Sequence, residues 1–212
     1  MPLFKQWKEG GAQWGIWKVT ESPAELQSLL TQASCLPEEL ACYKSPSRQL
    51  EYLAVRVLLL ALTGSEHRIA HYPSGKPYLV NTSAFLSVSH TKGYVAVGLH
   101  PQREIGIDIE QVADRVKKVR ARFVRPDELP GLENLSEEDQ RYELLLVWSG
   151  KESLFKVMNT SEVDFLEHLQ IDPFRLEPEG TLVGREYRTS SRRVYDVRYT
   201  IHPDFVCTYI IV

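Results

Sequence analysis

Two long helical segments, set among short strand-like segments, constrain the fold of this chain most strongly. The first begins near Ser45-Pro46 and runs to Leu62, and its apolar residues are dense enough for a central, buried helix. Gly64 behind it is typical of a helix C-cap. The second is expected from Glu137 to Met158 behind a Ser136 cap, with a loosening at Ser149-Gly150. With one dominant helix and several short strands in each half, the sequence predicts an α+β fold.

Shorter elements fill the space around these two helices. A helix is expected from Ser22 to about Ala33, because Ser22 is an N-cap, Pro23 suits the first helical position and Glu25 completes a capping box with Ser22. Residues 73–77 predict a turn. Seven strands are expected, at 13–19, 85–89, 94–99, 104–110, 181–189, 193–201 and 205–212.

Composition excludes several classes of protein. The chain has 212 residues and a formal net charge of −3, which argues against a general nucleic-acid binder. No apolar run approaches the roughly 20 residues that span a bilayer. The first eight residues lack the apolar core of a signal peptide, so we expect a cytoplasmic protein without membrane contact. Cys35, Cys42 and Cys207 show no CxxC spacing, which disfavours a disulfide scaffold or a cysteine zinc site.

The strand expected around 105–110 carries two carboxylates. Alternate strand residues share a face, so Gly106, Asp108 and Glu110 would point away from the isoleucines. Carboxylates at i and i+2 repel each other unless they are solvated or neutralised by a cation. Gly106 would leave room for a ligand beside the backbone. The alternative is an ordinary amphipathic strand with one solvated face.

The second long helix carries Trp148, Glu152 and Lys156 at i, i+4 and i+8, on one face. If this face meets the strand that carries Asp108 and Glu110, three carboxylates come together. Such an oxygen cluster suits Mg²⁺, and Lys156 beside it would contact phosphate oxygens. The alternative is a surface Glu–Lys pair beside a core tryptophan.

Two further polar segments favour anion binding over nucleophilic catalysis. Ser87 and Ser89 share one strand face, and His90 stands where the strand ends. Adjacent strand residues point to opposite faces, which disfavours a Ser–His nucleophile pair. Lys76 lies in a turn stiffened by Pro77; this is no P-loop, yet such a lysine can meet a phosphate. The alternative for the Ser87–His90 segment is an ordinary polar turn, and the alternative for Lys76 is an exposed lysine without a ligand.

Taken in order, these segments resemble the 4′-phosphopantetheinyl transferase superfamily. The resemblance extends from residue 48 to residue 156. Its motifs are Gly75-Lys76-Pro77, Ser87-Val88-Ser89-His90, Gly106-Ile107-Asp108-Ile109-Glu110, and Trp148 with Lys151-Glu152 and Lys156.

The length is similar to the larger, surfactin-synthetase-activating (Sfp-type) class. The resemblance then implies a monomeric pseudo-dimer with pseudo-twofold symmetry, in which each lobe is a small antiparallel sheet packed with a long helix. We expect an N-terminal lobe at 1–103 on the nucleotide side of a coenzyme A site. We expect a C-terminal lobe at 104–212 with metal-binding acids and carrier docking, and the active site between the two lobes.

The resemblance also implies a reaction. The 4′-phosphopantetheine arm of coenzyme A moves to a serine hydroxyl of an acyl, peptidyl or aryl carrier protein, and 3′,5′-ADP leaves. Mg²⁺, or Mn²⁺, would offset the developing charge, and Glu152 would be the general base. The resemblance assigns catalysis to Asp108, Glu152 and Lys156, the metal to Asp108, Glu110 and Glu152, and coenzyme A to Arg48, Arg56, Lys76, Pro77, Ser89, His90, Asp108 and Lys156.

The stretch from Arg115 to Arg125 holds six basic and no acidic residues. By resemblance it would receive the carrier protein, whose acidic surface would be steered by opposite charge. The alternative is a solvated helix face. Two other functions stay open at this point: an inactive protein that docks carrier proteins, and a different Mg²⁺-dependent phosphoester enzyme such as a nuclease or phosphatase.

Overall fold

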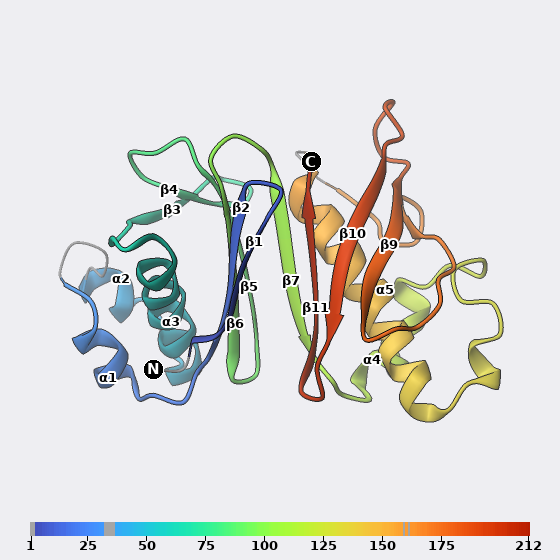
Figure 1. The fold of residues 1–212 in the computed structure, drawn as a ribbon, viewed down its shortest axis with the longest axis horizontal. Helices are drawn as coiled ribbons and strands as arrows, with labels where there is room; N and C mark the ends of the chain where they lie inside the picture. Colours follow the sequence, from blue (N-terminus) through green and yellow to red (C-terminus); the bar gives the residue numbers. More distant parts are fainter. Residues whose placement is uncertain (1–2, 32–36, 159, 161) are drawn as a thin grey trace. The chain divides into compact units, whose positions relative to one another are not determined.

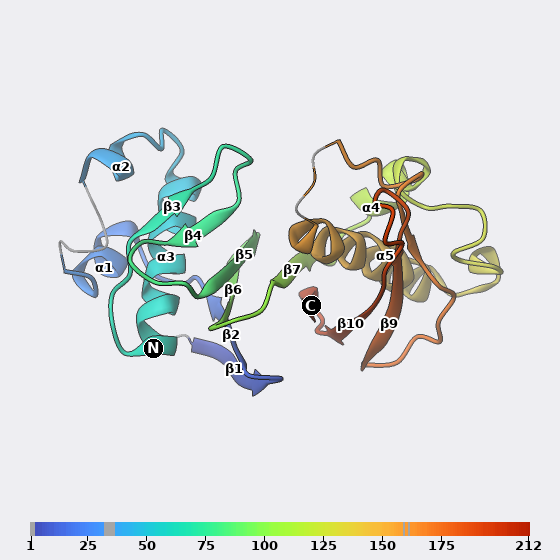
Figure 2. The ribbon, with the colours of Figure 1, turned by 90° about the horizontal axis from the view of Figure 1, so that it is seen from above.

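The computed structural model describes residues 3–31, 37–158, 160 and 162–212, apart from the side chains of 37 and 38. Ala33 and Cys35, used in the sequence predictions, lie outside these residues. The chain divides into two compact units: unit 1 is 1–105 with Ile211, and unit 2 is 106–210 with Val212. Each contains one long helix and an antiparallel sheet (Figures 1 and 2), which confirms the predicted α+β class. In the described part of the chain, no helix has the length and apolarity to cross a membrane.

Unit 1 is built on a four-stranded antiparallel sheet in the order β1-β2-β6-β5. The long helix α3 lies against this sheet (Figure 1), and Leu53 and Leu58 of α3 are buried with Trp17 and Val97. A two-stranded hairpin, β3-β4, completes the unit. The elements are β1 (Leu3–Glu9), β2 (Ala12–Lys18), α1 (Pro23–Ser28), α2 (Pro37–Ala41), α3 (Pro46–Thr63), β3 (Ile69–His71), β4 (Pro77–Leu79), β5 (Phe85–Thr91) and β6 (Tyr94–His100).

The helix ends of unit 1 follow the predicted capping signals. The Ser22 amide donates to Glu25 Oε2 at 2.7 Å and the Glu25 amide to Ser22 Oγ at 3.3 Å, a complete capping box for α1. This helix ends at Ser28, earlier than predicted. Helix α3 begins at Pro46 and ends at Thr63. Gly64 caps it, and its φ of 75° is the left-handed conformation that glycine adopts at little cost.

Unit 2 is built on a five-stranded sheet in the order β7-β11-β10-β9-β8, with α5 beside it (Figure 1). Leu146 and Leu154 of α5 are buried with Leu182, Val197 and Val206 of the sheet. The elements are β7 (Ile105–Gln111), α4 (Arg115–Val119), two 3₁₀ turns (Arg120–Arg122 and Leu132–Asn134), α5 (Glu137–Val157), β8 (Leu169–Ile171), β9 (Glu179–Glu186), β10 (Val194–Ile201) and β11 (Phe205–Ile211).

Helix α5 is continuous, so the predicted loosening at Ser149-Gly150 is wrong. Gly150 instead allows close packing of the helix against the sheet. A Cβ atom at Gly150 would lie 3.1 Å from Ile171 Cδ1 and 3.3 Å from Leu182 Cδ1. The missing side chain therefore lets α5 lie close to β8 and β9, and tertiary contacts outweigh the low helix propensity of glycine.

Candidate functional site

The carboxylates of β7 lie under α5 rather than in solvent. Asp108 is buried: its Oδ2 accepts a hydrogen bond from Ser149 Oγ at 2.7 Å, and its Oδ1 accepts one from Lys156 Nζ at 2.8 Å. Lys156 Nζ also donates to the Ile107 carbonyl at 2.7 Å. The strand is therefore not an amphipathic strand with one wet face, and the predicted meeting of its acids with α5 takes place.

Gly106 has a different role from the one expected. A Cβ atom at this position would lie 2.4 Å from the carbonyl oxygen of Ser153 on α5. The space that the sequence suggested for a ligand is taken by the helix backbone. Gly106 thus lets α5 approach β7 closely enough for the side chains of Ser149 and Lys156 to reach Asp108.

Glu110 and Glu152 complete a group of three carboxylates with Asp108, which we call the acid cluster. Trp148 Nε1 donates to Glu110 Oε1 at 2.7 Å, so the predicted helix face of Trp148, Glu152 and Lys156 does look toward β7. Burial raises the pKa of Glu110 to about 7, and the negative charge of Asp108 adds to the rise. Burial raises the pKa of Glu152 to about 7 as well, again with the charge of Asp108 adding to it.

The donor chemistry of the acid cluster fits a hard cation. All three side chains offer carboxylate oxygens, the ligands that Mg²⁺ takes in proteins. Among the residues that the structure describes, however, no group of three or more His, Cys, Asp or Glu side chains is arranged ready to hold a metal. Both carboxylate oxygens of Asp108 already accept hydrogen bonds, from Ser149 and from Lys156. A metal would have to replace at least one of these donors.

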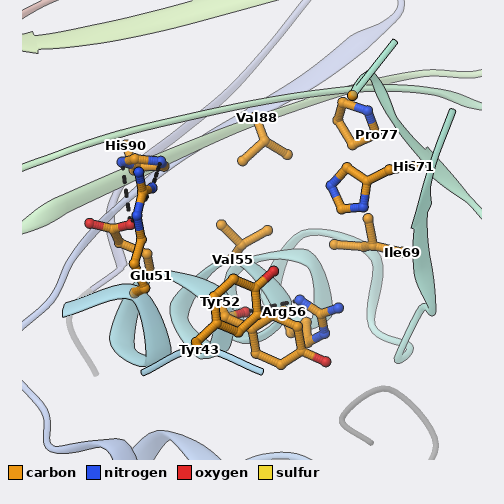
Figure 3. Close-up of a pocket in the computed structure, with 12 residues that line it drawn as sticks. Tyr43, Glu51, Tyr52, Val55, Arg56, Ile69, His71, Pro77, Val88 and His90 are labelled. Atoms are coloured by element: carbon orange, nitrogen blue, oxygen red, sulfur yellow. Dashed lines mark hydrogen bonds and ion pairs between the residues drawn. The ribbon is translucent and has the colours of Figure 1, made fainter. Parts of the chain in front are cut away.

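Unit 1 contains a pocket of about 300 Å³ between α3, the β3-β4 hairpin and β5 (Figure 3). Four of the residues that the resemblance assigned to coenzyme A line it, namely Arg48, Arg56, Pro77 and His90. The full lining is Tyr43, Arg48, Glu51, Tyr52, Val55, Arg56, Ile69, His71, Gly75, Pro77, Val88 and His90.

The cationic side chains of this pocket are held in place by neighbours. Arg48 NH1 donates to Glu51 Oε2 at 2.9 Å and to His90 Nε2 at 2.8 Å. The Arg56 side chain is 4% exposed, and its guanidinium carbon lies 3.4 Å from the centroid of the Tyr52 ring. The pocket therefore combines positive charge with aromatic and aliphatic walls, which suits an anionic ligand with a flat apolar part.

Two predicted contacts do not line the pocket. Lys76 Nζ pairs with Glu104 Oε2 at 2.6 Å. Ser89 is buried, and it alternates along β5 with Val88 and His90, whose side chains do line the pocket. Adjacent residues of a strand point to opposite faces, so Ser89 and His90 do not face the same pocket.

The aromatic residues of the pocket were missed by the sequence reasoning. Tyr52 could have been found, because Arg48, Tyr52 and Arg56 lie at i, i+4 and i+8 on one face of α3. Tyr43 and His71 come from a loop and from the β3-β4 hairpin, and no spacing in the sequence connects them to α3.

The basic stretch 115–125 forms α4 and a 3₁₀ turn, with Arg115, Lys118, Arg120 and Arg122 exposed. Lys117 lies 3.6 Å from Glu137 Oε2. An exposed basic face is compatible both with docking and with simple solvation.

Lys151, quoted in the resemblance, is fully buried and cannot contact a substrate. Its Nζ lies 2.7 Å from Glu128 Oε1 and 2.9 Å from Glu128 Oε2, and it donates to the carbonyls of Phe123 and Phe165. Lys151 therefore ties α5 to the end of the basic stretch and to the loop before β8.

Two comparisons with known proteins indicate the family of this chain. A family model described as the 4′-phosphopantetheinyl transferase superfamily matches residues 104–210, which include the whole acid cluster. A protein of Synechocystis sp., provisionally named a 4′-phosphopantetheinyl transferase, is 29% identical over 140 residues. That alignment covers 59% of this chain and 57% of the relative, so the chain matches less than two thirds of the relative's length. Because the family model spans half of the sequence, the chain belongs to the 4′-phosphopantetheinyl transferase superfamily.

Proposed function

We propose that this protein transfers the 4′-phosphopantetheine arm of coenzyme A to a serine hydroxyl of a carrier protein, with Mg²⁺. The observation that carries the proposal is the acid cluster, which β7 and α5 bring together inside the segment that matches the family. One buried and two partly buried carboxylates beside one lysine are costly for stability alone, since each like charge opposes the others. Such clusters occur where a protein binds a cation or moves a proton.

The residues of unit 2 suit the parts of this reaction. The serine oxygen forms a bond to the β-phosphorus, the bond from that phosphorus to the oxygen of 3′,5′-ADP breaks, and the serine proton must be taken up. Glu152 would take up that proton: burial raises its pKa to about 7 in the protein without metal, and a cation held by the same carboxylate would lower that pKa. Lys156 would donate to phosphate oxygens. Asp108, Glu110 and Glu152 would hold Mg²⁺, which supplies charge neutralisation at the diphosphate.

The pocket of unit 1 suits the nucleotide of coenzyme A. By the resemblance, Arg48 and Arg56 would receive the 3′-phosphate, which is the terminal phosphomonoester of coenzyme A. His90 would also contact phosphate, and Pro77 would form a wall for the adenine. Lys76, paired with Glu104, and Ser89 do not line this pocket, and their contact with coenzyme A stays a prediction.

The exposed basic residues of 115–125 would orient an acidic carrier protein. Such an encounter depends on ionic strength, because salt screens charges over about 10 Å at 0.1 M. We expect the KM for the carrier, and not that for coenzyme A, to rise with added salt.

Intact mass spectrometry tests the transferase directly. The protein is incubated with coenzyme A, Mg²⁺ and a panel of apo carrier proteins, and the carrier should gain the mass of the arm. Asp108→Ala and Glu152→Ala should abolish transfer. Glu138→Ala, an exposed acid on the same helix, is the matched control and should retain the full rate. No mass gain on any carrier would sink the proposal.

The same assay separates the two alternatives that the sequence left open. An inactive docking protein is favoured by one observation, the engagement of both Asp108 oxygens by protein donors, and it would bind a carrier without modifying it. A nuclease or phosphatase would release phosphate or cleave a polymer without binding coenzyme A in calorimetry.

A further inference from the structure

A carboxylate from α2 reaches the cations beside the pocket of unit 1. Glu39 Oε2 accepts a hydrogen bond from the Tyr52 hydroxyl at 2.7 Å and lies 3.4 Å from Arg56 NH2. Glu39 Oε1 lies 3.7 Å from Arg68 NH2. One anionic side chain thus gathers two guanidinium groups and a hydroxyl. This is the donor set with which proteins commonly bind a phosphate group.

The burial of these groups decides which of them can move. Arg56 is 4% exposed and is held by Tyr52 from two directions, since its guanidinium stacks on the ring and its NH1 donates to the Tyr52 carbonyl at 3.1 Å. The side chain of Glu39 is 32% exposed. Arg56 is therefore the fixed partner, and Glu39 is the one that can turn toward solvent.

Glu39 and a ligand phosphate would compete for the same cation. Arg56 lines the pocket, and Glu39 is bound to it from the α2 side. A phosphate that reaches Arg56 must either replace the Glu39 carboxylate or lie beside it, and two neighbouring anions repel each other. A ligand without that phosphate makes no such encounter.

We propose that Glu39 determines how tightly and how selectively the pocket binds the terminal phosphomonoester of its nucleotide. The inference rests on the proposed function, because it takes the pocket as the nucleotide site. In the absence of ligand, Glu39 satisfies Arg56 and Arg68. When ligand is bound, Glu39 weakens the hold on the phosphate and favours its release, which a transferase needs for turnover of 3′,5′-ADP.

A purely structural role for Glu39 predicts the opposite change in phosphate affinity when Glu39 is replaced. If Glu39 only held Arg56 in place, its removal would loosen the arginine and weaken phosphate binding. The two roles therefore differ in the direction of one measurement.

Calorimetry with two ligands makes that measurement. Wild type, Glu39→Gln and Glu66→Gln are titrated with coenzyme A and with 3′-dephospho-coenzyme A. Glutamine has the shape of glutamate and can still accept from the Tyr52 hydroxyl, so the fold should persist. Glu66→Gln removes the same charge in unit 1 at a residue that contacts the Thr31 amide and does not line the pocket.

Glu39→Gln should bind coenzyme A roughly three- to fivefold more tightly than wild type, the size expected for one partly screened ion pair. Its affinity for the dephospho ligand should stay within twofold of wild type, and Glu66→Gln should match wild type throughout. The coenzyme A affinity of Glu39→Gln should also fall more steeply with salt. Unchanged or weaker binding of coenzyme A by Glu39→Gln would overturn the inference.

Failure of the proposed function is recognised separately. If wild type binds neither ligand, the nucleotide assignment fails, and Glu39 is then tested with inorganic pyrophosphate as the probe. Pyrophosphate should raise the melting temperature of Glu39→Gln more than that of wild type, and equal shifts would overturn the role of Glu39. If melting without ligand shows that Glu39→Gln does not fold, Glu39→Ala takes its place in both assays.

Discussion

Replacing the buried lysine of α5 by methionine should destabilise unit 2 strongly. Lys151 and Glu128 are both fully buried and bridged at 2.7 Å. Lys151→Met keeps most of the side-chain volume and removes the charge. Within the described part of the chain, it leaves the Glu128 carboxylate with only the amides of Arg125 and Ile171 as hydrogen-bond donors, at 2.6 and 2.8 Å.

The expected cost follows from the charge that is left behind. Breaking a buried ion pair by removing one partner costs about 3–5 kcal/mol, because the other charge stays desolvated. The carbonyls of Phe123 and Phe165 also lose their lysine donor, which places the cost toward the upper part of that range. With a slope of about 2 kcal/mol per molar urea, a loss of about 4 kcal/mol lowers the unfolding midpoint by about 2 M.

Urea unfolding followed by hydrogen–deuterium exchange measures this loss of stability for unit 2 by itself. Peptides from α5 report unit 2 apart from unit 1. Lys118→Met is the matched control, because it makes the same chemical change at an exposed position and should stay within about 0.5 kcal/mol of wild type. The double variant Glu128→Gln with Lys151→Met should be more stable than Lys151→Met, since no buried charge is left. A loss below about 1 kcal/mol, or a double variant no more stable than the single one, would refute the reasoning.

The pH dependence of Lys151→Met has a definite sign. Burial already raises the pKa of Glu128 in the folded wild type, and the Lys151 charge acts against that rise. Without Lys151 the pKa of Glu128 rises further. A group whose folded pKa lies above its unfolded value favours folding at pH below the unfolded value, and this contribution is lost as the pH rises through the folded value. The deficit of Lys151→Met should therefore shrink when the pH is lowered toward 4.5, and a deficit that is equal at pH 8 and pH 5 would contradict this explanation.

Three local substitutions test other parts of the reasoning. Gly106→Ala places a Cβ atom 2.4 Å from the Ser153 carbonyl, so α5 must shift, and thermal unfolding should show a loss of about 1–3 kcal/mol. Gly64→Ala meets no atom within 4 Å but keeps a φ of 75°, so a cost of about 1 kcal/mol in urea would reflect backbone conformation alone. Ser22→Ala removes the side-chain acceptor for the Glu25 amide, and faster hydrogen exchange at the start of α1 should accompany a loss of about 1 kcal/mol. An unchanged stability in any of the three would contradict the contact or backbone conformation named for it.

The elements predicted from the sequence are those with strong local signals. Both long helices begin and end within one residue of the prediction, because Ser136 and the Pro46 and Gly64 signals act within a single turn. The elements not predicted have weak local signals. Strand β1 is mostly exposed and has no apolar alternation, and it exists because β2 offers it a pairing edge. Strands β3, β4 and β8 are three residues long, and each is fixed by its partner strand.

The candidate site also has a part that local sequence spacing predicts and a part that depends on tertiary contacts. The spacing of Trp148, Glu152 and Lys156 was sufficient to predict one helix face, and the spacing of Asp108 and Glu110 one strand face. That these faces meet depends on Gly106 and on the approach of α5 to β7. In unit 1 the sequence indicated the cations of the pocket. The placing of Lys76 and Ser89 away from it depends on Glu104 and on the face that β5 presents.

The sequence by itself determined the α+β class, the ends of the long helices, and the residue types that can bind a phosphate group and a cation. These properties follow from neighbours along the chain, within a few residues of one another. Only the tertiary structure decided that Lys151 is buried in an ion pair, that Gly106 makes room for helix α5 and not for a ligand, and that Glu39 reaches Arg56. Each of these depends on residues 14 or more positions apart, and such contacts are selected by packing and burial, which no local pattern records.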